Sequence, residues 1–122
     1  AGEGPAERIE SFIHILIANK ADIKRYGCPV GTLCSELAKL SHVNLAAASE
    51  LFTLFRVWLH RQFELLGHKK DADTLAMHLL ARSQGVATLA SAFRDDAFIR
   101  REVDLMCEWL HALSAHRAST KK

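Results

Sequence analysis

Apolar residues recur along this chain at steps of three and four, which is the spacing of one face of an α-helix. No segment shows the alternation of a half-buried strand. Glycine, proline and polar clusters divide the pattern into helical segments, which span about residues 5–26, 28–40, 44–66, 73–93 and 96–115. The sequence therefore predicts an all-α fold of five helices in an antiparallel, bundle-like arrangement.

The helix predicted over residues 44–66 has a clear stop signal. Gly67 follows its last apolar residue, and glycine readily adopts the left-handed conformation that closes many helices. Residues 68–71 are polar, so we expect a solvated loop there. Either Asp71 or Asp73 is available to cap the helix that follows.

The last predicted helix carries two adjacent apolar stripes. One stripe comprises Ile99, Val103, Met106, Leu110 and Leu113, and the other comprises Phe98, Leu105 and Trp109. One stripe can face the chain's own core, whereas the other needs a partner surface. Gly85, in the middle of the preceding helix, costs about 1 kcal/mol relative to alanine, a cost easier to understand if another backbone approaches there. These two helices therefore predict a surface that binds a partner.

Composition narrows the class of protein. The 122 residues fit one domain, and the balance of 49% hydrophobic and 25% charged residues is that of an ordinary globular protein. A net charge of +2 is too weak to indicate a nucleic-acid-binding surface. No apolar run approaches the roughly 18 residues of a membrane span. The ends, residues 1–5 and 117–122, are expected to be disordered.

The cysteines predict a cytoplasmic protein without disulfides. Cys28, Cys34 and Cys107 form no CxxC pair and leave one cysteine odd. They are best explained as reduced, small apolar residues.

A more specific signal lies between Tyr26 and Leu37. This run, YGCPVGTLCSEL, resembles the GCPxGxLxxEL segment of TetR-family transcriptional regulators. The order that follows is similar too: a long helix with Trp58, an Ala/Leu-rich helix with Gln84 and Gly85, an Asp-Asp turn and a terminal amphipathic helix. The resemblance covers about residues 7–113 and is to the C-terminal, effector-binding and dimerisation domain of that family.

The family's N-terminal helix-turn-helix domain has no counterpart in this sequence. The resemblance therefore implies that operator DNA is bound only by the parent protein, through that missing domain. It also implies a repressor in which effector binding moves the first helix and relieves DNA binding. No enzymatic activity, cofactor or metal is expected.

The resemblance further implies two sets of site residues. The last two helices would pack against their twofold mates as a four-helix bundle, through Ala81, Gly85, Thr88, Leu89, Val103, Met106, Trp109 and Leu110. The effector pocket, among the first four helices, would be lined by Phe12, Leu16, Leu33, Leu37, Phe55, Trp58, Leu59, Phe63 and Gln84. This apolar, aromatic lining suggests a small hydrophobic effector.

Simpler explanations stay open for several of these residues. Any one ring of the stripe Phe52, Phe55, Trp58 and Phe63 can be ordinary core packing. The spacing of His60, Glu64 and His68 would allow zinc binding on one helix face, but we expect ordinary surface pairing because His68 follows Gly67. Cys107 and His111 lie one turn apart, and two ligands do not make a metal site.

Two other functions remain as alternatives. One is a helical interaction module whose exposed stripe binds a different protein, and this module would be a monomer. The other is a cysteine enzyme or redox protein built around Cys28 and Cys34. It would require a positioned base and an oxyanion site, for which the sequence offers no clear candidates.

Overall fold

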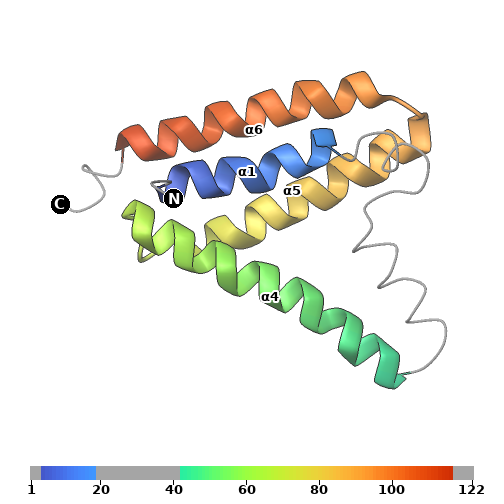
Figure 1. Cartoon of the computed structure of the whole chain (residues 1–122), viewed down its shortest axis with the longest axis horizontal. Helices are drawn as coiled ribbons and strands as arrows, with labels where there is room; N and C mark the ends of the chain where they lie inside the picture. The colour runs from blue at the N-terminus through green and yellow to red at the C-terminus, as the bar shows by residue number, and fades with distance from the viewer. Residues whose placement is uncertain (1–3, 19–41, 117–122) are drawn as a thin grey trace.

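A computed structural model describes residues 4–18 and 42–116 of the chain. This part consists of helices α1 (Pro5–Ala18), α4 (His42–Leu66), α5 (Ala72–Phe93) and α6 (Asp96–His116), and it contains no strand (Figure 1). The predicted all-α class is confirmed, and the last three helices begin and end within two residues of their predicted bounds. The helix expected over residues 28–40 lies outside the described residues.

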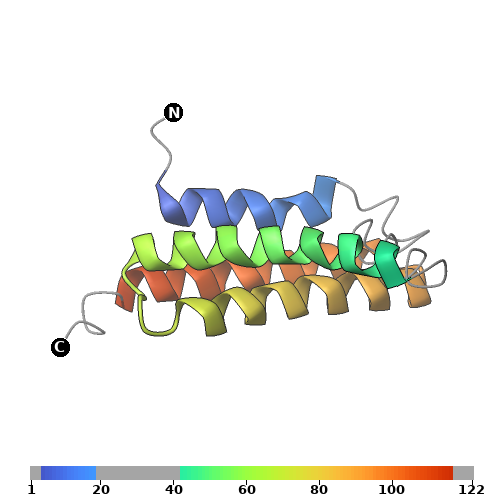
Figure 2. The same ribbon diagram turned by 90° about the horizontal axis from the view of Figure 1, so that it is seen from below.

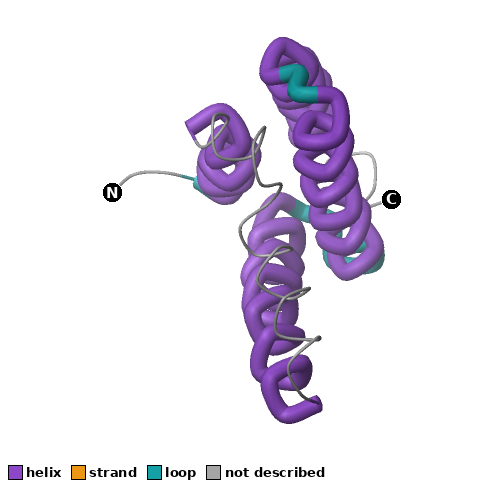
Figure 3. Tube along the Cα trace, turned by 90° about the vertical axis from the view of Figure 1, so that its right-hand side faces the viewer, coloured by secondary structure: helices purple, strands orange, loops and turns teal. Residues whose placement is uncertain are grey.

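The helices pair in antiparallel fashion. α1 packs beside α6, and α4 packs beside α5, to which it is joined by a short connection (Figures 1 and 3). Figure 2 shows α1 and α4 toward one face of the molecule and α5 and α6 toward the other. Contacts between α1 and α4 and between α5 and α6 close the bundle.

One hydrophobic core is shared by all four helices. Its fully buried large side chains are Ile9 and Ile13 of α1, Leu59 and Phe63 of α4, Leu79 of α5, and Ile99, Val103, Met106 and Leu110 of α6. They recur at steps of three and four, so each helix contributes one stripe. Burying each such side chain stabilises the fold by about 1.5–3 kcal/mol, which explains why these stripes fix the rotation of every helix.

The end of α4 agrees with the sequence prediction. Gly67 has a φ of 110°. Its N–H donates to the carbonyl of Glu64 at 3.0 Å, and the N–H of His68 donates to the carbonyl of Phe63 at 3.0 Å. These paired bonds form a Schellman motif, which satisfies carbonyls that the helix end would otherwise leave unpaired.

The prediction of a solvated loop over residues 68–71 is wrong for its first residue. Only 5% of His68 is exposed, and its Nε2 lies 2.9 Å from the carbonyl oxygen of Leu113. A carbonyl only accepts hydrogen bonds, so Nε2 donates. The last carbonyls of a helix lack partners within the helix, and His68 supplies one to α6. Lys69, Lys70 and Asp71 are exposed, as predicted.

Aspartates begin the next two helices in different ways. Asp71 occupies the N-cap position of α5 without a side-chain cap bond. The Oδ1 of Asp95 accepts a hydrogen bond from the N–H of Phe98 at 3.0 Å and so caps α6. Arg94, between α5 and α6, has a left-handed φ of 54°.

We predict that Gly67→Ala lowers the free energy of unfolding by about 1 kcal/mol, because a Cβ strains the left-handed conformation. Lys70→Ala is the matched control, because Lys70 is exposed in the same connection and has no positive φ. It should change stability by less than about 0.5 kcal/mol. Urea unfolding at one chain concentration measures both, and equal stability of the two variants would contradict the motif at Gly67.

Candidate functional site

An open apolar groove of about 930 Å³ runs between α1 and α4. It is lined by Arg8, Ser11, Phe12, Ile15, Leu54, Phe55, Val57, Trp58 and Arg61. The volume falls within the range of small-molecule pockets, about 300–1,000 Å³. The groove is therefore the leading candidate for a ligand site in the described part of the chain.

Three aromatic rings, which lie close together, belong to the lining of this groove. The ring centroid of Phe12 lies 5.8 Å from that of Phe55 and 6.3 Å from that of Trp58. Both pairs are tilted, and tilted rings at this separation attract each other beyond simple burial. Around the rings, 66% of Leu54 and 62% of Val57 are exposed. So much exposed apolar surface in one place is characteristic of a binding surface.

Two arginines add positive charge to the lining of the groove. The Nη1 of Arg8 donates to the Oε1 of Gln62 at 3.2 Å, and Gln62 is itself buried. This bond anchors the guanidinium of an otherwise exposed side chain. Arg61 lies 3.7 Å from a carboxylate oxygen of Glu64. Since a guanidinium has five N–H donors, both arginines can also bind an anionic group of a ligand.

The residues predicted to line a single pocket are divided by the structure. Phe12, Phe55 and Trp58 line the groove. Leu59 and Phe63 are fully buried in the core, where Phe63 packs edge-on against Trp109 with centroids 6.0 Å apart. Core packing is thus the correct interpretation for these two.

Gln84, the polar member of the predicted set, lies at a different place. It helps to line a smaller groove of about 260 Å³ between α4 and α5, together with Phe52, Thr53, Arg56, Met77, Leu80 and Ala81. Arg56 and Asp73 bridge the same two helices, with Nε–Oδ1 and Nη2–Oδ2 distances of 2.8 and 2.6 Å. Leu33, Leu37 and the side chain of Leu16 lie outside the described residues.

Sequence reasoning missed six residues of the larger groove: Arg8, Ser11, Ile15, Leu54, Val57 and Arg61. A signal for two of them exists. Leu54 and Val57 extend the apolar surface of α4 well beyond the stripe that the core needs. The arginines gave no signal, because charged residues on a helix are usually solvated.

The predicted dimer residues are divided as well. Val103, Met106 and Leu110 are fully buried inside a single chain, so their side chains contact their own core rather than a second subunit. Ala81, Gly85, Thr88 and Leu89 are exposed on α5, and Trp109 is half-buried. Of the two stripes on α6, the first belongs to the core, and the second includes Leu105, of which 47% is exposed.

The solvent face of α5 is unusual in its lack of charge. Its exposed residues from position 74 to position 93 are Thr74, Met77, His78, Ala81, Gly85, Thr88, Leu89, Ala92 and Phe93, none of them acidic, Lys or Arg. His78 lies against Trp109 of α6, with ring centroids 5.2 Å apart, so this face is continuous with the second stripe of α6. A solvated helix normally has charged residues on its outer face.

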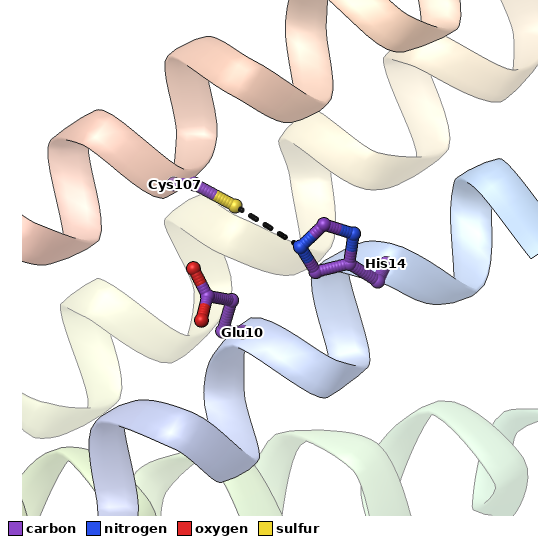
Figure 4. A group of neighbouring side chains, drawn as sticks. All are labelled: Glu10, His14 and Cys107. Atoms are coloured by element: carbon purple, nitrogen blue, oxygen red, sulfur yellow. Dashed lines mark hydrogen bonds between the residues drawn. The ribbon is translucent and has the colours of Figure 1, made fainter.

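A cluster of polar side chains joins α1 to α6 on the other side of the bundle (Figure 4). Ligand atoms of Glu10, His14 and Cys107 all lie within 4.8 Å of one another. Burial, and then the charge and hydrogen bond of Glu10, raise the pKa of the Cys107 thiol to about 11. His111 Nε2 lies 3.1 Å from Glu10 Oε2.

The histidines of the possible zinc site on α4, His60 and His68, do not bind the same partner. His60 Nε2 lies 3.5 Å from Glu64 Oε2, which confirms the expected surface pairing. His68 instead binds the carbonyl of Leu113. Cys28 and Cys34 lie outside the described residues.

A comparison with models of protein families places most of the chain in a known family. Residues 5–103 match the family model TetR_C_13_2, described as the C-terminal domain of LmrA/YxaF-like transcriptional regulators. No curated protein matches the chain. None of the helices in residues 4–18 and 42–116 has the length and apolar character needed to cross a membrane.

We predict that Arg56→Gln raises the pKa of Asp73. The hydrogen bonds from Arg56 lower the pKa of this carboxyl below its ordinary value, so the pair stabilises the fold above the unfolded-state pKa of about 3.9. This stabilisation is lost as the pH falls through the lower, folded-state pKa. Titration of the Asp73 carboxyl by NMR measures the change, and Asp95, whose neighbour Arg101 lies 3.9 Å away, serves as the reference. An unchanged pKa of Asp73 in this variant would contradict the ion pair between Arg56 and Asp73.

Proposed function

Because the chain belongs to the TetR family, as a C-terminal domain of the LmrA/YxaF-like type, we propose that its groove between α1 and α4 binds a small-molecule effector. The observation that carries the proposal is the groove itself: three clustered rings, exposed aliphatic side chains and two arginines in a regulatory domain. Binding there is non-covalent and needs no catalytic group.

The lining indicates the chemistry of the effector. Rings and aliphatic side chains favour a planar or chain-like apolar body. Arg8 and Arg61 favour one anionic group, such as a carboxylate, at the arginine-lined part of the groove. The effector class is therefore an amphipathic organic anion.

The groove also suggests how binding is transmitted. One of its walls is α1 and the other is α4, so a ligand that fits between them changes how the two helices pack. An effector can shift the conformational equilibrium only by its difference in affinity for the two states, and couplings of about 1–3 kcal/mol are typical. In the parent regulator, movement of α1 would alter the positions of the DNA-binding domains and release the operator.

We further propose that the uncharged face of α5, with the second stripe of α6, forms the homodimer interface. Ala81, Gly85 and Thr88 follow a step of four and three residues, so their small side chains make one flat strip along α5. Leu89 and Leu105 flank it as exposed apolar residues. No atom of the described residues lies within 4 Å of a Cβ placed at Gly85, so a close approach by a second subunit would explain this glycine.

An interaction module for a different protein is the second candidate, because the same uncharged face could bind such a partner. The two functions differ in oligomeric state. Light scattering during gel filtration should give about twice 13.6 kDa for the homodimer and 13.6 kDa for the module.

To test the effector site, we propose anilinonaphthalene sulfonate as a probe, since it combines an apolar body with an anion. Val57→Glu should weaken its binding about tenfold or more, because a carboxylate would be desolvated in the groove and would repel the probe. Thr53→Glu, at the smaller groove but away from the proposed dimer face, is the matched control. Fluorescence titration should show loss of affinity for Val57→Glu alone. Loss for Thr53→Glu alone would move the site to the groove that contains Gln84.

To test the interface, we predict that Gly85→Leu converts the dimer into a monomer while circular dichroism shows an intact fold. A Cβ at this position meets no atom of the described residues within 4 Å, whereas the larger side chain would collide with a second subunit. Ala97→Leu, at an exposed position of α6, should stay dimeric. A dimer that survives Gly85→Leu would refute this interface.

A further inference from the structure

The geometry points to a second, metal-binding site: we propose that Glu10, His14 and Cys107 bind one zinc ion between α1 and α6. The proposal is independent of the effector groove. It starts from two pairs of residues, each spaced one helical turn apart: Glu10 and His14 on α1, and Cys107 and His111 on α6. Each pair alone is unremarkable, but the antiparallel packing of the two helices brings them face to face.

The distances are close to those that zinc requires. Zinc bonds of about 2.3 Å to sulfur and about 2.0–2.1 Å to nitrogen place tetrahedral S and N ligands about 3.6 Å apart. The Sγ of Cys107 lies 3.8 Å from the Nε2 of His14. The Glu10 carboxylate completes a set in which all ligand atoms lie within 4.8 Å of one another.

The side chains of the three proposed ligands are also directed toward one another. In Figure 4 the His14 ring faces the Cys107 sulfur across the gap between the helices, and the Glu10 carboxylate reaches toward the same sulfur. His14 is exposed, and Glu10 and Cys107 are half-buried. An ion can therefore enter from solvent, while the two helices shield one side of it.

The donor set selects the metal. One sulfur, one imidazole nitrogen and one carboxylate oxygen suit zinc, whereas magnesium and calcium prefer oxygen alone. On binding, the thiol proton of Cys107 is released to solvent and a zinc–sulfur bond forms. The thiolate and the Glu10 carboxylate then balance the two positive charges of the ion. The fourth coordination position is open to water.

His111 has a positioning role in this site. Its Nε2 donates to Glu10 Oε2 at 3.1 Å, on the carboxylate that would bind the ion. Hydrogen bonds of this kind orient metal ligands, and their loss typically weakens metal affinity about 10- to 100-fold. The site thus uses all four residues of the two helical pairs.

The test is a zinc titration of the whole chain, stripped of metal and kept reduced, in competition with a coloured zinc chelator. We expect one zinc per chain. Cys107→Ser and His14→Gln should each abolish binding, and His111→Gln should weaken it about 10- to 100-fold. Substitution of cobalt(II) provides a readout specific to the ligands, since thiolate-to-metal charge-transfer absorption should appear in the wild type and be absent from Cys107→Ser.

Two controls make the result decisive. His60→Gln removes a histidine that also has a glutamate one turn away, at 3.5 Å, but no cysteine, and should leave zinc binding unchanged. Cys28→Ser combined with Cys34→Ser removes the other thiols and should also leave it unchanged. Circular dichroism verifies that each variant is folded. The proposal is overturned if the chain does not compete for zinc, or if folded Cys107→Ser retains the wild-type affinity.

Discussion

The arrangement of this domain depends on the burial of Leu59 and Phe63 at the centre of the bundle. Both side chains are fully buried, and they meet the stripes of α1, α5 and α6 there. Once this face of α4 is committed to the core, the rotation of the helix is fixed. Leu54, Val57 and Trp58 then have to point away from the core, toward α1 and solvent. The groove is therefore a direct result of an α4 that is apolar over more of its circumference than the core can cover.

The same constraint separates the two stripes of α6. Ile99, Val103 and Met106 fill the core, so the stripe that contains Leu105 and Trp109 lies toward α5 and the outside. The outer face of α5 next to it has no charged residue among its exposed positions. The proposed effector groove and the proposed dimer face thus lie on different sides of one core. The packing of this core is the part of the domain that the two proposed sites share.

The sequence predicted the bounds of α4, α5 and α6 well because their signals are local. Gly67 ends α4, the Asp-Asp turn marks the start of α6, and the spacing of Ile99, Val103 and Met106 identifies the buried stripe. Sequence alone did not settle which apolar residues leave the core, because that depends on helix rotation to within about a quarter turn. For this reason Leu59 was expected in a pocket and Met106 at an interface. The bond from His68 to Leu113 was missed because it joins residues 45 positions apart.

The cluster at Cys107 shows the same limit most clearly, because its two halves are 93 residues apart in the sequence. It also changes how α1 should be viewed. On one flank of its buried stripe, α1 contributes Phe12 to the groove, and on the other flank it contributes His14 to the cluster with α6. In the two proposals, a ligand between α1 and α4 would push on one flank, while an ion between α1 and α6 would hold the other. A displacement of α1 toward α6 or along it would therefore alter the ligand distances at the ion. Binding at the proposed effector groove and binding at the proposed zinc site would thus both affect the position of α1.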